Sequence, residues 1–159
     1  PTILKGYLSA ESSWIFQVDS DNEISPDQFE KIWISRINKD FVIGKRVGRD
    51  FVVSRILVSF IARLSVLILY GRGIEDVNCP FRLFSRDVFI SELKKIPNDS
   101  FAPNVILSGI AINMKSRIQN IPVVFIPRST GEVSIKKIKL LKQSARSLLQ
   151  LVKFRLNNG

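Results

Sequence analysis

The chain has 159 residues, about the size of one domain, and its 45% hydrophobic content is enough to build a buried core. Its 24 basic and 14 acidic residues give a net charge of +10, which favours an anionic partner such as a nucleic acid, a phosphorylated substrate or a membrane surface. There is no histidine and one cysteine, which excludes histidine-dependent nucleophilic catalysis, zinc sites built from histidine or several cysteines, and intrachain disulfides.

Apolar periodicity and turn residues divide the chain into alternating strands and helices, which is typical of an α/β layer fold. The expected elements are strands or extended segments at 14–18, 40–44, 81–84 and 117–127, and helices at 25–37, 51–70, 85–95, 102–114 and 135–156. Ser25 suits the N-cap of the first helix, with Pro26 in the first helical position and Gln28 placed to close a capping box. Pro122 interrupts the last strand, so we expect that strand to be bent or at a sheet edge.

The segment 51–70 is the most apolar part of the chain and is long enough to cross a membrane. It contains Arg55 and Arg63, however, and an arginine near the centre of a span costs roughly 2.5–3.5 kcal/mol on insertion scales. We therefore expect a buried helix or a helix at a membrane surface in place of a transmembrane span.

Two aspartates follow the first expected strand directly. Asp19 and Asp21 lie in the polar loop after the strand, and Glu23 adds a third carboxylate. Ligands of open α/β sheets bind beyond the carboxyl ends of the strands, and Mg²⁺ is commonly held by one or two carboxylates together with substrate phosphates. The loop is thus a candidate metal site; the alternatives are a solvated acidic turn and, for Glu23, an acid at a helix start.

Basic residues follow the second expected strand. Arginine side chains bind phosphate oxygens through two parallel hydrogen bonds, so Arg46 and Arg49 are candidates for contacting a phosphate group. Gly44 would let the backbone turn sharply at this point. The alternative is an ordinary solvated turn.

Two later loops also combine charged residues with turn residues. In the first, Glu75 or Asp76 is a candidate general base toward a hydroxyl group, or else caps a helix or pairs with Arg72 or Arg82. Cys79 in the same loop is expected to be a packed small residue and not a reactive thiol. In the second, Arg128 can clamp a diphosphate while its small neighbours let the loop close, or it lies in an ordinary turn.

Taken in order, the segments WIFQVDSD, SPDQF, DFVIGKR, EDVNCPFRLFSR and IPVVFIPRSTGEVS resemble the later part of a family 2 glycosyltransferase with the GT-A fold. The nearest branch contains the dolichol-phosphate mannosyltransferases and their bacterial polyprenyl-phosphate relatives. The resemblance spans roughly residues 6–156. It implies the C-terminal portion of a Rossmann-like GT-A catalytic domain at 1–132, followed by a basic amphipathic helix at 133–159.

The resemblance also implies an activity: inverting transfer of a sugar from a nucleotide-diphosphate sugar to a polyprenyl phosphate or a glycan hydroxyl. Asp19 and Asp21 would hold Mg²⁺ or Mn²⁺ against the donor diphosphate, which Asp21 and Arg128 would help to bind. Asp76 would take the proton of a hydroxyl acceptor, whereas a phosphate acceptor is already anionic and needs no base. The residues expected on the acceptor side are Arg46, Arg49 and Arg55.

The chain departs from this pattern in two ways. The branch usually has Ser-Gly-Phe-Arg where this chain has Cys79-Pro80-Phe81-Arg82, which weakens the transfer of its acceptor. The family also begins with a strand and loop that bind the nucleotide base, and the given sequence lacks that part. We therefore expect the given chain to bind the donor poorly and to be inactive by itself.

The excess charge is concentrated at the C-terminal end. All acidic residues lie at or before Glu132, whereas 133–159 contains seven basic residues without an acidic one. An apolar stripe recurs there at helical spacing through Ile138, Leu141, Ala145, Leu148, Val152 and Leu156. This helix is expected either to dock on the core or to contact an anionic membrane surface, which predicts a cytoplasmic, peripheral location at the inner face of the membrane. The competing hypothesis is a non-catalytic basic membrane-surface module; no recognised motif favours nucleic acid as a partner.

Overall fold

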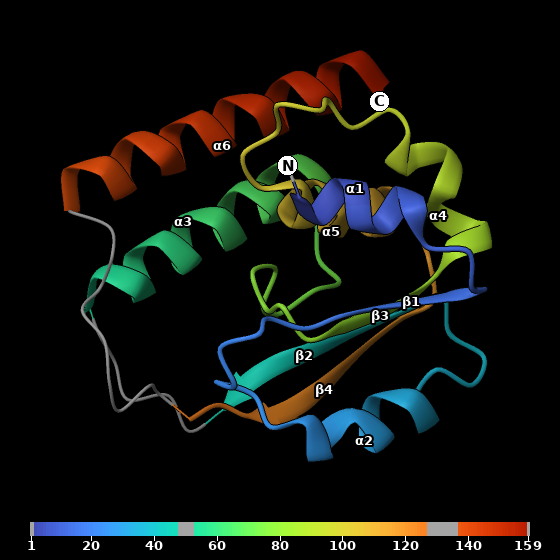
Figure 1. The fold of residues 1–159 in the computed structure, drawn as a ribbon. Coiled ribbons are helices and arrows are strands. Elements are labelled where there is room, and N and C mark those ends of the chain that lie inside the picture. Colours follow the sequence, from blue (N-terminus) through green and yellow to red (C-terminus); the bar gives the residue numbers. More distant parts are fainter. Residues whose placement is uncertain (1, 48–52, 127–136, 159) are drawn as a thin grey trace.

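The computed structural model describes residues 2–47, 53–126 and 137–158 (Figure 1). Its elements are α1 (Thr2–Ser9), β1 (Trp14–Gln17), the 3₁₀ turn η1 (Pro26–Gln28), α2 (Phe29–Ile34), β2 (Phe41–Val47), α3 (Val53–Tyr70), β3 (Arg82–Ser85), α4 (Arg86–Leu93), α5 (Pro103–Asn113), β4 (Ile118–Val124) and α6 (Lys137–Asn158). The type of every expected element is confirmed. Helix α1 was not expected, because its short run of mixed residues carries no clear start signal.

The four strands form one mixed sheet in the order β1-β3-β2-β4. Strand β3 runs antiparallel to both β1 and β2, whereas β4 runs parallel to β2. Strands β1, β2 and β4 therefore end at the same edge of the sheet, which is also where β3 begins. We call this the carboxyl edge. As expected for a strand that contains Pro122, β4 lies at the side of the sheet.

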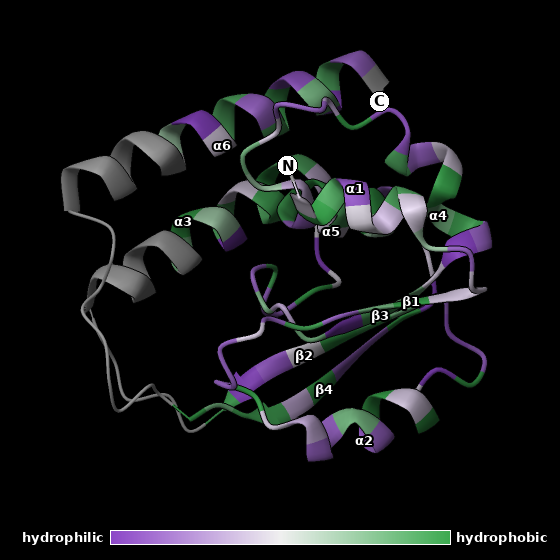
Figure 2. Ribbon diagram, in the orientation of Figure 1, coloured by the Kyte–Doolittle hydropathy of each residue, from purple (hydrophilic) through white to green (hydrophobic). Residues whose placement is uncertain are grey.

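Helices cover both faces of the sheet (Figure 1). Helix α2 lies alone on one face, and α1, α3, α4, α5 and α6 lie on the other. The core between the sheet and the larger helical layer contains a cluster of aromatic rings in which Phe41 and Phe84 stack at 5.9 Å and both contact Phe89. Helix α5 is the central helix, and all its residues from Val105 to Ile112 are buried. Its hydrophobic character is visible in Figure 2.

The N-terminus of the helical segment formed by η1 and α2 differs from the expected capping box. Ser25 is the N-cap, as expected, and its hydroxyl accepts a hydrogen bond from the Asp27 amide. Gln28 does not close the box. Its side chain instead donates to the Val124 carbonyl at 3.0 Å and accepts from the Val124 amide at 2.7 Å. Gln28 therefore joins α2 to the end of edge strand β4, a partner that sequence spacing could not indicate.

Helices α3 and α6 pack against each other and against α5. Tyr70 near the end of α3 covers Gly109 of α5 so closely that a Cβ atom on this glycine would lie 2.7 Å from the ring. Arg155 of α6 donates to the Leu69 carbonyl at 3.2 Å and its guanidinium lies 5.5 Å from the centre of the Tyr70 ring. Among the described helices, none is both long and apolar enough to cross a membrane.

The buried face of α6 is described for residues 145–157. There Leu151 and Phe154, which lie outside the predicted stripe, are buried, whereas Leu156, which belongs to it, is 78% exposed. The stripe residues Ile138 and Leu141 lie outside the part of the helix whose burial is described. Helix α6 is thus docked on the protein, one of the two expected arrangements. The domain boundary at 132/133 stays a prediction.

Candidate functional site

The predicted chemical residues converge at the carboxyl edge. Asp19 and Asp21 follow β1, Arg46 lies near the end of β2, and Asp76 lies in the loop that leads into β3. These positions are up to 57 residues apart in sequence, and the mixed topology of the sheet brings them to one edge.

Three of the predicted site residues are not described by the structure. Arg49 and Arg128 lie outside the described residues. Arg55 belongs to α3, but its side chain is outside the described set. Their predicted contacts with acceptor and donor stay predictions.

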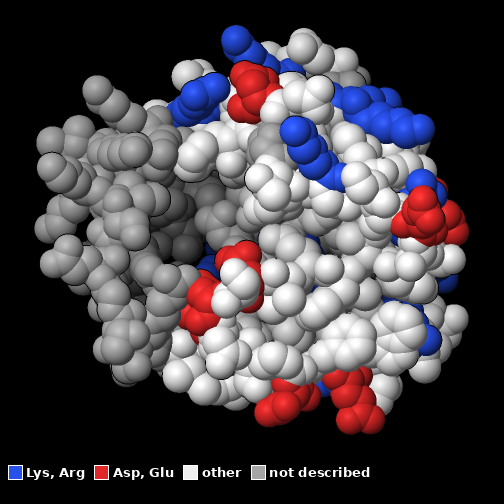
Figure 3. Space-filling view, viewed as in Figure 1, with Lys and Arg blue, Asp and Glu red and all other residues white. Residues whose placement is uncertain are grey.

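Asp19 lies in a cluster of acidic groups. Partial burial, followed by the negative charges of Asp21 and Glu23, raises its pKa above the ordinary value for an aspartate, while Arg82 and Arg46 act in the opposite direction. Asp21 accepts a hydrogen bond from the Glu23 amide at 3.2 Å, which shapes the loop. Figure 3 shows acidic side chains gathered beside a hollow on this face of the molecule. Such clustered carboxylates repel one another, so a bound cation would stabilise them.

Arg46 and Asp76 form a two-point ion pair. Arg46 Nε donates to Asp76 Oδ2 at 2.7 Å and Arg46 Nη2 donates to Oδ1 at 2.8 Å. Only 9% of the Arg46 side chain and 15% of the Asp76 side chain are exposed. Burial opposes the charged form of Arg46, but the hydrogen bonds and charge of Asp76 outweigh it and raise the arginine pKa. The pair therefore stays ionised, and it joins the expected base to the expected acceptor-side arginine.

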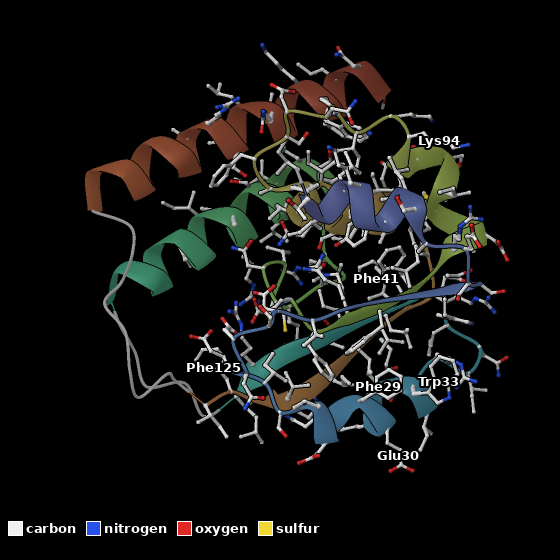
Figure 4. All side chains as sticks on the ribbon, in the orientation of Figure 1. Phe29, Glu30, Trp33, Phe41, Lys94 and Phe125 are labelled. Atoms are coloured by element: carbon white, nitrogen blue, oxygen red, sulfur yellow. The ribbon has the colours of Figure 1, made fainter. Side chains whose placement is uncertain are left out.

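Neighbouring groups hold this ion pair in place. The Arg46 guanidinium lies 5.8 Å from the centre of the buried Phe125 ring, and Phe125 is seen beside the end of the sheet in Figure 4. Lys45 and Glu75, which directly precede Arg46 and Asp76 in the sequence, form a second ion pair at 2.5 Å. Thus two consecutive basic residues of β2 bind two consecutive acids of the loop before β3, which aligns the loop with the strand.

A side chain of β4 anchors the same loop from the other side. Asn120 accepts a hydrogen bond from the Glu75 amide at 3.0 Å and donates to the Gly73 carbonyl at 2.8 Å. The amide group of Asn120 therefore replaces the backbone partners that this turn lacks. The sequence reasoning missed this residue, since an asparagine within a strand has no local signal for such a role.

Arg82 is the largest site feature that sequence reasoning missed. Its side chain is completely buried, although arginine is rarely found there. It donates to the carbonyl of Cys79 at 2.6 and 3.1 Å, to that of Val77 at 3.1 Å and to that of Asn104 at 2.7 Å. Arg82 thereby fastens the loop before β3 to helix α5. The sequence did contain a signal for this role: Arg82 directly follows Pro80 and Phe81 at the start of an expected strand, where an arginine side chain needs polar partners.

Gly44 has a different role from the one expected. It lies within β2 and is buried, so it does not form a turn. A Cβ atom at this position would lie 2.8 Å from Val123 Cγ2 and 2.9 Å from Cys79 Sγ. The missing side chain lets the loop that carries Cys79 pack directly on the strand. Cys79 is fully buried, and desolvation raises the pKa of its thiol to about 11, as expected for a packed residue.

The donor set fits a hard cation that shares its ligands with a substrate. Within the part of the chain that the structure describes, no three acidic or cysteine side chains are arranged to enclose a metal ion. Asp19 and Asp21 supply oxygen ligands from one loop, which matches the way Mg²⁺ is held by one or two carboxylates plus phosphate oxygens.

Comparison with known proteins identifies the fold. No model of a protein family matches the sequence, and no curated protein matches it. A solved structure is similar: glucosyl-3-phosphoglycerate synthase from Mycobacterium tuberculosis in complex with uridine diphosphate, with a TM-score of 0.62 and 12% sequence identity. The predicted fold class is confirmed. The match covers 96% of this chain and 53% of that chain, so the chain spans about half of that enzyme's length. The mixed sheet and its helices form a glycosyltransferase-type α/β fold of the GT-A kind. At this identity the likeness concerns the fold alone, and the dolichol-phosphate mannosyltransferase-like branch stays a prediction.

Proposed function

We propose that this chain contributes to a glycosyltransferase that uses a nucleotide-diphosphate sugar and a divalent metal ion. The observation that carries the proposal is the convergence of Asp19 and Asp21 with the Arg46–Asp76 pair at one sheet edge. The similar solved enzyme holds uridine diphosphate, which agrees with a nucleotide-sugar donor.

The roles proposed for the residues follow from their charges. Asp19 and Asp21 would hold Mg²⁺ or Mn²⁺, which when bound offsets the negative charge of a leaving nucleoside diphosphate. Arg128 would contact the same diphosphate from its own loop. The pKa of Asp19 is raised by burial and by its acidic neighbours, so this site should load metal better as the pH rises and Asp19 ionises.

The ion pair of Arg46 with Asp76 bears on the nature of the acceptor. A carboxylate held at two points by a guanidinium is a weaker base than a free one, so a hydroxyl acceptor would require the pair to open. A phosphate acceptor needs no base, and Arg46 can offer it positive charge, together with Arg49 and Arg55. The ion pair therefore supports a phosphate acceptor, and an inverting single displacement is proposed on the resemblance to family 2 glycosyltransferases.

The metal and donor sites can be tested by titration calorimetry. Mn²⁺ and uridine diphosphate or guanosine diphosphate are titrated into the protein, and the measurement is repeated on Asp19→Asn and Asp21→Asn. We expect each variant to lose at least tenfold in Mn²⁺-dependent nucleotide affinity. The control Asp87→Asn, at an exposed position of α4, should keep the affinity of the wild type. Equal affinity in wild type and both site variants would refute the proposed site.

Transfer itself is tested on the longest version of the protein that the parent reading frame encodes. A panel of nucleotide sugars is incubated with it, and release of nucleoside diphosphate is measured with either a polyprenyl phosphate or a glycan that offers a free hydroxyl as the acceptor. Asp76→Asn should slow transfer to the hydroxyl far more than transfer to the phosphate. Equal losses on both acceptors would contradict the proposed division of roles.

The second candidate function is a non-catalytic basic module at a membrane surface. It is favoured by the unbalanced basic residues of α6, of which Arg146 and Lys153 are exposed. It predicts that Asp19→Asn and Asp21→Asn leave the affinities for Mn²⁺ and for nucleotide unchanged. The cytoplasmic, membrane-peripheral location and the absence of a nucleic-acid partner stay predictions under either function.

A further inference from the structure

Helix α3 is apolar on two opposite sides. Val66 and Ser65 face the core and are buried. The opposite side carries four large apolar residues with substantial exposure: Phe60 (58%), Leu64 (42%), Leu67 (40%) and Ile68 (72%). Their spacing of four, three and one residues places them in one stripe along the helix. We call these four residues the outer stripe of α3.

The outer stripe is not covered by the helices that pack on α3. Helices α5 and α6 contact α3 (Figure 1), and the stripe stays exposed beside both of them. Helix α6 places Leu151 and Phe154 against the protein and exposes Leu149 and Leu156. Exposed apolar surface is therefore found on α3 as well as on the C-terminal helix.

Basic residues predominate around the stripe, although Glu75 lines a pocket together with Leu67 and Arg63. Neither α3 nor α6 contains an acidic residue, whereas their sequences contain eight basic residues. These are Arg55, Arg63, Lys137, Lys139, Lys142, Arg146, Lys153 and Arg155. Arg63 lies beside the outer stripe on α3 and is exposed, and Arg72 follows the helix, also exposed. This combination of an apolar stripe and an unbalanced positive field suits a surface that is apolar within and anionic outside.

We propose that the outer stripe of α3 docks on an anionic lipid bilayer, with the helix lying in the interface plane. Phe60, Leu64 and Ile68 enter the boundary between head groups and acyl chains, and Arg63 contacts the lipid phosphates. Helix α6 adds positive charge beside α3, and its exposed Leu149 and Leu156 add further apolar surface. A second copy of the chain is a poorer occupant, because two such faces would bring like charges together.

This proposal does not rest on the proposed transferase function, because it needs neither donor nor metal. Its assay is sedimentation of the full chain with sucrose-loaded vesicles of phosphatidylcholine, or of phosphatidylcholine and phosphatidylglycerol at about 3:1. The main variant is the double substitution Leu64→Ser/Ile68→Ser. Its matched control is Ile34→Ser/Ile37→Ser, which removes two isoleucines of similar exposure: Ile34 at the end of α2, which covers the other face of the sheet, and Ile37 in the turn after it.

We expect wild type and the control to bind the anionic vesicles with affinities within about twofold, and the stripe variant to bind about tenfold more weakly. Arg63→Gln should weaken binding by about fivefold, which corresponds to about 1 kcal/mol for one basic residue at the membrane surface. Binding of wild type to neutral vesicles should be weaker than to anionic ones.

A second measurement covers the case in which the double variant folds poorly. Ile68→Cys is labelled with an environment-sensitive bimane dye, which is selective because the native Cys79 is fully buried. Its emission should shift to the blue on anionic vesicles, whereas the same label at Ile37→Cys should not respond. Three outcomes would overturn the proposal: no binding of wild type to anionic vesicles, binding that the stripe variant retains, or a dimer in sedimentation velocity that the stripe variant abolishes.

Discussion

The most demanding prediction concerns Arg82, a fully buried cation that fastens the loop carrying Asp76 to helix α5. Arg82→Met keeps much of the side-chain volume and removes all the N–H donors. The Cys79 carbonyl then loses both of its contacts with the guanidinium. The Ser108 hydroxyl lies 3.3 Å from the Val77 carbonyl and 3.0 Å from the Asn104 carbonyl, and it can donate its one proton to either of them.

The expected cost follows from these contacts. One buried carbonyl without its donors costs about 1–3 kcal/mol, and two others lose a charge-assisted hydrogen bond each. Relief from burying the guanidinium offsets part of this loss. We therefore expect the free energy of unfolding to fall by about 3 kcal/mol in Arg82→Met, and by less in Arg82→Lys, which keeps the charge without the planar fork.

Urea denaturation followed by tryptophan fluorescence measures this change, with Arg72→Met, an exposed arginine in the preceding loop, as the matched control. The control should stay within about 0.5 kcal/mol of wild type. Ser108→Ala should cost more in the Arg82→Met background than in wild type, because the Ser108 hydroxyl is then the remaining side-chain donor to the carbonyls of Val77 and Asn104, one of which it can satisfy. An unfolding free energy of Arg82→Met equal to that of the control would refute the reasoning.

Three further predictions concern the sheet and its edge. Gly44→Ala should lower the free energy of unfolding by about 1–3 kcal/mol, since its Cβ atom would collide with Val123 and Cys79. Adding Cys79→Ala should restore part of this loss. Full stability of Gly44→Ala by itself would contradict the packing. The thiol of Cys79, with its pKa raised to about 11, should resist iodoacetamide at pH 8 until the protein unfolds, as mass spectrometry of the alkylated protein would show. The hydrogen bond from Arg117 holds the pKa of Asp40 below its usual value, so its contribution to stability is present above the unfolded-state pKa and is lost as the pH falls through the lowered one. Asp40→Asn should accordingly be less stable than wild type at pH 7 in urea titrations, and a gap that persists unchanged at pH 2 would refute this assignment.

The types and order of the elements were predictable because their signals are local. Ser25 and Pro26 announce a helix start within a few residues, and the apolar run before Asp19 indicates a buried strand. The same locality explains the errors. Gln28 lies at the right spacing for a capping box, yet its side chain bonds to Val124 of a strand 96 positions away.

The candidate site likewise combines features that local sequence signals predicted with features that depend on long-range contacts. The sequence placed Asp19 and Asp21 after a strand and indicated Arg46 and Asp76 as charged loop residues. It offered Arg72 and Arg82 as alternative partners for an acid of this loop, which is wrong for Asp76, because Asp76 pairs with Arg46. The choice of Arg46 depends on the register of β2 against β3, which is a long-range property of the sheet.

By itself, the sequence of this protein determined the alternation of strands and helices, the absence of histidine chemistry and the presence of carboxylates after the first strand, because composition and short spacings decide these features. The tertiary structure alone decided that Arg82 is buried, that Gly44 admits the Cys79 loop, and that α3 carries an exposed apolar stripe on the side away from the core. These features depend on which surfaces meet when the sheet and its helices pack. The periodicity of a helix shows that it has an apolar side, but only packing determines which apolar side is covered.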